Sequence, residues 1–213
     1  MKKIVLFLLL MVASQMGWAQ HTIESIRKTY ADVKESIAMM SDNFPSEGIP
    51  AEYYHLRVAQ NLRATGPHTE DIRMYFNEVE QDEDEDWNPY PYHWLRLATA
   101  KYNFAVRQYY EEYLYDDKGQ VMFIYAITPE VGDDMIPYEL RMWFDGKRLL
   151  RFTAKKAEVT IPFDYDNLSA FKYKEEYSGT TIPGQYSSET DRLKDRAQHL
   201  LKMFEGIDRN KYI

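Results

Sequence analysis

The chain contains no cysteine among its 213 residues. The absence excludes disulfide bonds, thiolate metal sites, CxxC redox chemistry and cysteine nucleophiles. It also excludes a bacterial lipid anchor, which is attached to a cysteine directly after the signal-peptide cleavage site. We therefore expect core packing alone to hold the fold.

Familiar catalytic motifs are also missing. The sequence has no GxSxG nucleophile elbow, no glycine-rich phosphate loop and no HExxH or HxH histidine spacing. Together these absences disfavour common hydrolases and kinases, and they predict neither a cofactor nor a catalytic residue. An unrecognised hydrolase stays open as an alternative, because a missing motif excludes only the chemistry that uses it.

Positive charge is in deficit. The chain has 34 acidic and 26 basic residues, which gives a net charge of −8. Without Lys2 and Lys3, which we expect to be removed, 24 basic residues remain and the net charge is about −10. Such a field repels phosphate backbones and anionic lipid headgroups, so we expect neither nucleic acid nor a membrane surface as partner.

Long apolar runs are confined to the first twenty residues. Two lysines precede an unbroken apolar run, Ile4 to Ala13, and a small residue, Ala19, follows it. This order is typical of a secretory signal peptide, and the run is shorter than the roughly 20 residues that span a bilayer. We expect cleavage between Ala19 and Gln20 and a periplasmic or secreted product. A retained membrane anchor is the alternative.

Two amphipathic helices are predicted in the mature chain. The first, from about Thr22 to Met40, carries an apolar stripe with spacings of three and four: Ile23, Ile26, Tyr30, Val33, Ile37 and Met40. The second begins at a capping box, Ser188 to Asp191, and is expected to end at Gly206. Its apolar stripe consists of Leu193, Ala197, Leu200, Leu201 and Phe204.

The segment between these helices has the two-residue period and the turn signals of about eight short antiparallel strands. Gly119 and the pair Asp145-Gly146 mark two hairpin turns. Residues 121–127 are apolar on both faces, which predicts a central strand covered on both sides. The strand candidates are nine ranges, at about 53–62, 72–76, 93–99, 109–115, 120–128, 138–144, 147–152, 159–163 and 171–177.

This order predicts an α+β fold in a single domain, residues 20–213, after the signal peptide of residues 1–19. An N-terminal helix would precede a twisted antiparallel β-meander, and a C-terminal helix would pack on the sheet. A closed barrel with flanking helices, enclosing a small ligand, is the alternative architecture.

The most conspicuous polar feature is the acidic run 80–86. Asp82, Asp84 and Asp86 alternate like the first ligands of a calcium loop. The EF-hand pattern then fails, because Trp87 stands where a glycine is needed and His93 where a glutamate is needed. We interpret the run as a solvated loop, with a calcium site of another type as the alternative.

Aromatic side chains crowd the segment that follows the acidic run. If they are exposed, these rings form a platform for a sugar or a protein. Polar and proline neighbours favour a surface position, so we take this loop as the candidate binding site. The tyrosines of strand 109–115 are interpreted instead as core. The four candidate binding residues are Trp87, Tyr90, Tyr92 and Trp94.

Histidines and paired glutamates were also considered as sites. A turn near Gly66 would pair His68 with about Arg63, which leaves His55 too far along the strand to share a metal. Glu111-Glu112 and Glu175-Glu176 resemble paired catalytic carboxylates. Adjacent residues of a strand point to opposite faces, however, so neither pair can converge on one bond.

Several short segments of the chain resemble a group of exported proteins from gut Gram-negative bacteria, a group without an established activity. The segments are Trp18–Gln20, Ile26–Ala31, Arg73–Asn77 and Arg107–Leu114, scattered over most of the chain. The resemblance implies export and a single domain, and it assigns no catalytic residue.

The sequence therefore leads to a functional hypothesis of a non-enzymatic exported binding or accessory module for a protein or glycan partner. A carrier of a small apolar ligand inside a curved sheet or barrel is the alternative, followed by the unrecognised hydrolase.

Overall fold

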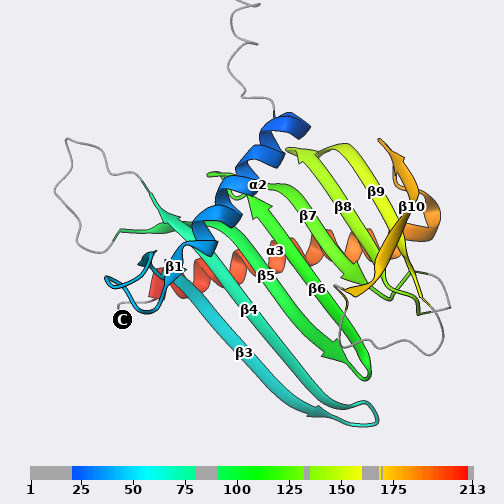
Figure 1. Cartoon of the computed structure of the whole chain (residues 1–213), viewed down its shortest axis with the longest axis horizontal. Helices are drawn as coiled ribbons and strands as arrows, with labels where there is room; N and C mark the ends of the chain where they lie inside the picture. Colours follow the sequence, from blue (N-terminus) through cyan, green and yellow to red (C-terminus); the bar gives the residue numbers. More distant parts are fainter. Residues whose placement is uncertain (1–20, 80–90, 132–134, 160–167, 169, 211–213) are drawn as a thin grey trace, which may run out of the picture.

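The chain forms three layers, with one helix on each face of an antiparallel sheet (Figure 1). The computed structural model describes residues 21–79, 91–131, 135–159, 168 and 170–210. In Figure 1, α2 (Ile23–Ala38, blue) crosses one face of the sheet and α3 (Gly184–Asn210, orange to red) lies along the other. The predicted α+β architecture, with the C-terminal helix packed on the sheet, is confirmed.

The main sheet is a meander in which each strand pairs with the next strand along the chain. Its order is β10-β9-β8-β7-β6-β5-β4-β3, so the sheet is open, and the closed-barrel alternative is wrong. β1 (Met40–Ser41) and β2 (Ile49–Pro50) form a separate small parallel pair. The main strands are β3 (Tyr53–Leu62), β4 (Gly66–Glu78), β5 (His93–Phe104), β6 (Arg107–Tyr115), β7 (Val121–Thr128), β8 (Tyr138–Asp145), β9 (Arg148–Glu158) and β10 (Lys172–Gly179).

α2 begins at Ile23, directly after its N-cap Thr22, close to the predicted start at about Thr22. The Thr22 hydroxyl accepts a hydrogen bond from the Ser25 backbone N–H at 3.1 Å, and the Ser25 hydroxyl accepts one from the Thr22 N–H at 3.0 Å. This reciprocal capping satisfies two of the N–H groups that a helix start leaves free. The apolar stripe then places Ile26 and Val33 in a buried cluster with sheet residues Tyr75, Leu97, Leu114, Met122, Phe123 and Trp143.

α3 covers the opposite face of the sheet. The predicted stripe is buried there through Leu193, Ala197, Leu200 and Phe204, against a larger set of sheet residues that includes Tyr113, Ile124, Leu140 and Phe152. Side chains of β7 alternate between the two cores, with Phe123 toward α2 and Ile124 toward α3. The prediction that β7 is a central strand with both faces covered is therefore confirmed.

The bounds of α3 differ from the prediction at both ends. The helix begins at Gly184, directly after Pro183, and it continues through Gly206 to Asn210. Ser188 does not cap it, because the predicted cap region already lies within the helix, where Glu189 binds Arg192. Gly206 does not end it, because glycine only weakens a helix that tertiary packing supports.

The first hairpin is tighter than predicted. Leu62 already pairs with Gly66, so His68 lies opposite Gln60 and not Arg63. The register moves because Ala64 takes a positive φ of 68° and closes the turn early. Glycines occupy the positive-φ positions of the predicted turns, with φ of 73° at Gly119 and 58° at Gly146.

Several strands are longer than their sequence patterns. β5 continues to Phe104, where Ala105 turns the chain with a φ of 53° into β6. β9 continues to Glu158, because both of its neighbours extend the hydrogen-bonded ladder. Of the strand predicted at 159–163, Val159 is not in a strand and residues 160–163 lie outside the described residues.

Candidate functional site

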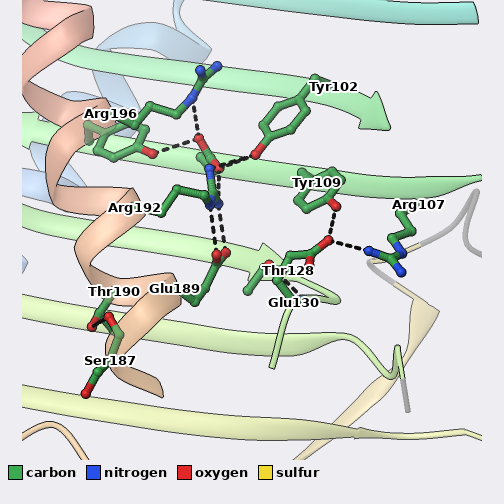
Figure 2. A network of polar contacts seen from close by, with 12 residues as sticks. Tyr102, Arg107, Tyr109, Thr128, Glu130, Ser187, Glu189, Thr190, Arg192 and Arg196 are labelled. Carbon is green, nitrogen blue, oxygen red and sulfur yellow. Dashed lines mark hydrogen bonds and ion pairs between the residues drawn. The ribbon is translucent and has the colours of Figure 1, made fainter. Parts of the chain in front are cut away.

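The most unusual group in the fold is Glu111 of β6, a carboxylate with no exposed surface at the interface between sheet and α3. Arg192 Nη2 and the Tyr102 hydroxyl each donate to its Oε1 at 2.7 Å. Arg196 Nε at 2.8 Å and the Tyr113 hydroxyl at 2.7 Å donate to its Oε2. Each carboxylate oxygen therefore receives one charged and one neutral donor (Figure 2).

Strand alternation decides where this carboxylate points. Glu111 faces α3, whereas its neighbour Glu112 faces α2 and binds Lys34 at 2.9 Å. The interpretation that the two glutamates cannot converge on one bond is confirmed. Each has become the buried polar centre of a different face.

Arg192 links three groups of the network. Its Nε and Nη2 donate to the two oxygens of Glu189 at 2.8 and 2.7 Å, and its Nη1 donates to the Tyr102 hydroxyl at 2.9 Å. Burial acts to lower the pKa of this guanidinium. The hydrogen bonds that Arg192 donates to Glu189, together with the negative charge of Glu111, have a larger effect than burial. The pKa of Arg192 therefore lies well above its ordinary value. Figure 2 shows Glu189 and Arg192 meeting on α3.

Arg196 lies one turn further along α3 and joins Glu111 to the sheet residue Glu70. Its ring contact is with Tyr102, 5.0 Å from the guanidinium carbon to the ring centroid. Burial lowers the pKa of Arg196. Guanidiniums keep their proton across the physiological range, so both arginines supply charge to Glu111.

A second set of contacts continues toward the β5–β6 turn. Tyr102 and Tyr109 stack with ring centroids 4.5 Å apart, and the Tyr109 hydroxyl bonds to Glu130. Arg107 Nη1 donates to the same Glu130 oxygen at 2.9 Å. Burial raises the pKa of both tyrosines, and the glutamate charges raise it further. Figure 2 shows Glu130 between Arg107 and Tyr109.

These groups border an open groove of about 640 Å³ beside α3. Four carboxylates line it, from Glu70, Glu130, Glu189 and Asp195, against the two guanidiniums of Arg192 and Arg196. The groove is therefore rich in hydrogen-bond acceptors. Phe104, with 45% of its surface exposed, adds an aromatic wall.

Two of the four predicted aromatic residues, Trp87 and Tyr90, lie outside the described residues. All three aspartates of the proposed calcium site, Asp82, Asp84 and Asp86, also lie outside them. Tyr92 is exposed over 60% of its surface. Trp94 is partly buried in β5, opposite Asn77. Neither residue lines the groove beside α3.

The strand tyrosines and two of the histidines, His55 and His93, take structural positions. Tyr109, Tyr113 and Tyr115 are buried, which confirms their interpretation as core. His55 pairs with Asp71 at 2.7 Å, and His93 pairs with Asp208 at 2.8 Å. Within the described ranges, no three histidine or acidic side chains are grouped to hold a metal ion.

Sequence reasoning missed the network around Glu111. A usable signal existed, because a glutamate inside an aromatic strand needs cations, and Arg192 and Arg196 are four residues apart beside an apolar stripe. The signal was incomplete, since nothing local says which helix covers which face. The tertiary structure supplies that information.

No family model, no curated protein and no solved structure matches the chain. Any function must therefore be inferred from the structure itself, an antiparallel meander between two helices with a polar groove beside α3. The resemblance to exported proteins of gut bacteria stays a prediction.

Proposed function

We propose that the chain is a non-enzymatic binding module that holds a neutral glycan in the groove beside α3. One observation carries the proposal: an open, acceptor-rich groove of about 640 Å³ lies against a polar network whose own charges are already paired. Such a frame is rigid before a ligand arrives, which lowers the entropy cost of binding.

The acceptors suit a ligand rich in hydroxyl donors. Glu130 is exposed over 36% of its side chain, and Asp195 is exposed on the groove wall. Carboxylate oxygens accept hydrogen bonds from sugar hydroxyls, while an aromatic ring packs on the C–H face of the sugar. Phe104 supplies such a ring at the rim of the groove.

The same network argues against catalysis at Glu111. A general acid or base must come within hydrogen-bond reach of the substrate. Glu111 has no exposed surface and already accepts four hydrogen bonds. Its role is therefore to hold α3 on the sheet and to fix the two arginines that border the groove.

Export belongs to the proposal as well. The order of lysines, apolar run and small residues at 1–19 supports a signal peptide cleaved between Ala19 and Gln20, and a periplasmic or secreted protein. None of the helices among the described residues is both long and apolar enough to cross a membrane. N-terminal sequencing of host-derived protein tests the cleavage: Gln20 as first residue supports export, and a retained leader argues against it.

Glycan binding is testable with a panel of neutral oligosaccharides, screened on an array and then measured by calorimetry. We expect Phe104→Ala and Glu130→Gln each to weaken binding about fivefold or more, because an aromatic contact or a hydrogen bond to a charged group contributes about 1 kcal/mol or more. Val106→Ala is the matched control, since Val106 lies in the adjacent turn and is exposed over 74% of its surface.

Three results would contradict the proposal: no oligosaccharide binds, bound oligosaccharide is cleaved, or the two groove variants bind as well as the control. Cleavage would point to an enzyme. Recovery of a tightly bound protein from the host, with no glycan binding, would point to the protein-partner form of a binding module.

A carrier of a small apolar ligand is a second candidate, favoured by another groove of about 520 Å³ between α3 and the β6–β7 and β8–β9 turns. Its apolar lining includes Val121, Ile124, Phe144 and Leu201. Native mass spectrometry of host-purified protein distinguishes the candidates, because a carrier would retain an apolar molecule and a glycan module would not.

A further inference from the structure

The opposite face of the sheet carries a second groove, of about 350 Å³, between α2 and strands β6 to β8. Its walls come from Arg27 and Tyr30 of α2 and from Phe123, Tyr125 and Trp143 of the sheet. This volume is near the lower end of the range found for ligand pockets, so the groove suits a small molecule. This groove shares no lining residue with the one beside α3.

Two arginines in this groove lie over aromatic rings. The Arg27 guanidinium carbon lies 5.5 Å from the Trp143 ring centroid, and that of Arg141 lies 5.3 Å from the Tyr125 centroid. A guanidinium can lie over an aromatic ring and still bind a carboxylate through its N–H groups, with up to two parallel hydrogen bonds.

The hydrogen-bonding capacity of these arginines is not used up within the described part of the chain. Arg27 is exposed and forms no ion pair there. Arg141 Nη2 lies 3.1 Å from Glu139, yet the buried Nε of Arg141 lacks a hydrogen-bond partner among the described residues. A buried donor without a partner is costly.

The charge of the groove lining is opposite in sign to the net charge of the chain. The groove lining carries two cations, Arg27 and Arg141, and one acidic group, Glu112. The lining therefore has an excess of one positive charge in a chain with a net charge of −8. An anion is therefore attracted to this face and repelled by most of the remaining surface.

Tyrosine hydroxyls in the groove narrow the ligand class further. Tyr30 and Tyr110 donate to Glu112, and Tyr125 donates to Glu139 at 3.4 Å. Each hydroxyl donates its hydrogen bond to a glutamate. Its oxygen keeps a lone pair that can accept a hydrogen bond from a ligand hydroxyl. The groove thus combines cationic N–H edges with a row of hydroxyl acceptors.

We infer that the groove beside α2 binds a sugar acid of hexuronate size, with its carboxylate on Arg27 and Arg141 and its hydroxyls on the tyrosine oxygens. The inference concerns a second ligand class on the other face and does not depend on glycan binding beside α3.

Titration calorimetry of the mature chain with glucuronate tests the inference, with glucose as the neutral probe and benzoate as a carboxylate without hydroxyls. We expect glucuronate to bind at least tenfold more tightly than either comparison ligand, since each lacks one of the two recognition elements. Arg27→Gln and Arg141→Gln should each weaken glucuronate binding at least tenfold. Arg57→Gln, an exposed arginine of β3 outside the groove, should leave it unchanged.

Arg141→Lys is a second test variant, because it keeps the positive charge at this position and removes the planar set of guanidinium N–H donors. Circular dichroism shows whether each variant is folded, and binding by Arg141→Lys is expected to fall between that of the wild type and Arg141→Gln. Equal affinity for glucose and glucuronate, absence of glucuronate binding, or full binding by both folded glutamine variants would each overturn the inference.

Discussion

At the residue scale, Glu111 explains most of how the α3 face is organised. Burying a carboxylate costs several kcal/mol unless charged and neutral donors replace its water. Here Tyr102, Tyr113, Arg192 and Arg196 make that replacement, and they come from three different elements. One side chain therefore fixes the position of α3 along the sheet and the shape of the groove beside it.

Glu111→Gln is expected to destabilise the fold by roughly 3 kcal/mol, the range for breaking a buried ion pair on one side. The amide keeps one acceptor oxygen, but its NH₂ group faces donors where the second carboxylate oxygen was. Urea unfolding followed by circular dichroism measures the loss. Glu205→Gln, at an exposed position of α3, is the control. A loss below about 0.5 kcal/mol would show that the network contributes little to stability.

At the element scale, α3 shows how tertiary packing overrides local signals. Gly206 reads as a stop in the sequence, yet the helix continues past it to Asn210. Beyond Gly206, the Asp208 carboxylate accepts from the Tyr54 hydroxyl at 2.7 Å and from the His93 backbone N–H at 2.9 Å. These contacts hold the last turn of α3 against β3 and β5, so the glycine does not end the helix.

Gly206→Ala should raise the free energy of unfolding by about 0.5–1 kcal/mol, because alanine is a better helix former and a Cβ there meets no atom within 4 Å. Gly146→Ala should lower the free energy of unfolding by about 1–2 kcal/mol, because Gly146 has a φ of 58° in the β8–β9 turn and a side chain is strained at that angle. Urea midpoints of the two variants provide the comparison. Destabilisation by Gly206→Ala would mean that the helix ends at Gly206 after all.

At the scale of the whole molecule, an acidic chain without disulfides is held by two cores on opposite faces of one sheet. Tyrosine contributes much of this packing, and six tyrosine hydroxyls donate to glutamates: those of Tyr30, Tyr102, Tyr109, Tyr110, Tyr113 and Tyr125. Burial is the first cause that raises the pKa of nine described tyrosines: Tyr30, Tyr102, Tyr109, Tyr110, Tyr113, Tyr115, Tyr125, Tyr173 and Tyr186.

Stability should therefore have an alkaline limit. For Tyr125 the pKa is raised to about 12, above the unfolded value of about 10. The folded chain then holds protons that the unfolded chain releases, so stability is complete below about pH 10 and falls as pH rises toward 12. Tyrosinate absorbance at about pH 11 should be well below that of urea-unfolded chain. Equal absorbance, or an unfolding midpoint that is constant above pH 10, would contradict this view.

Local patterns were sufficient to predict the order helix, antiparallel strands, helix, although not the small β1–β2 pair. The sequence correctly predicted the start of α2 within one residue of Thr22, the hairpin turns at Gly119 and Gly146, and the burial of both apolar stripes, because each depends on residues close in sequence. Strand lengths and the bounds of α3 were less predictable, since hydrogen bonding to neighbouring strands and packing on the sheet extend elements beyond their own patterns.

The sequence by itself determined a cysteine-free, acidic α+β chain with two amphipathic helices and an antiparallel meander. Only the tertiary structure decided that the helices cover opposite faces, that the sheet stays open and that Glu111 meets two arginines from a helix more than 80 residues away. The physical reason is the distance along the sequence over which each effect acts. Periodicity and turn chemistry depend on residues a few positions apart, whereas a groove forms where segments distant in sequence pack together.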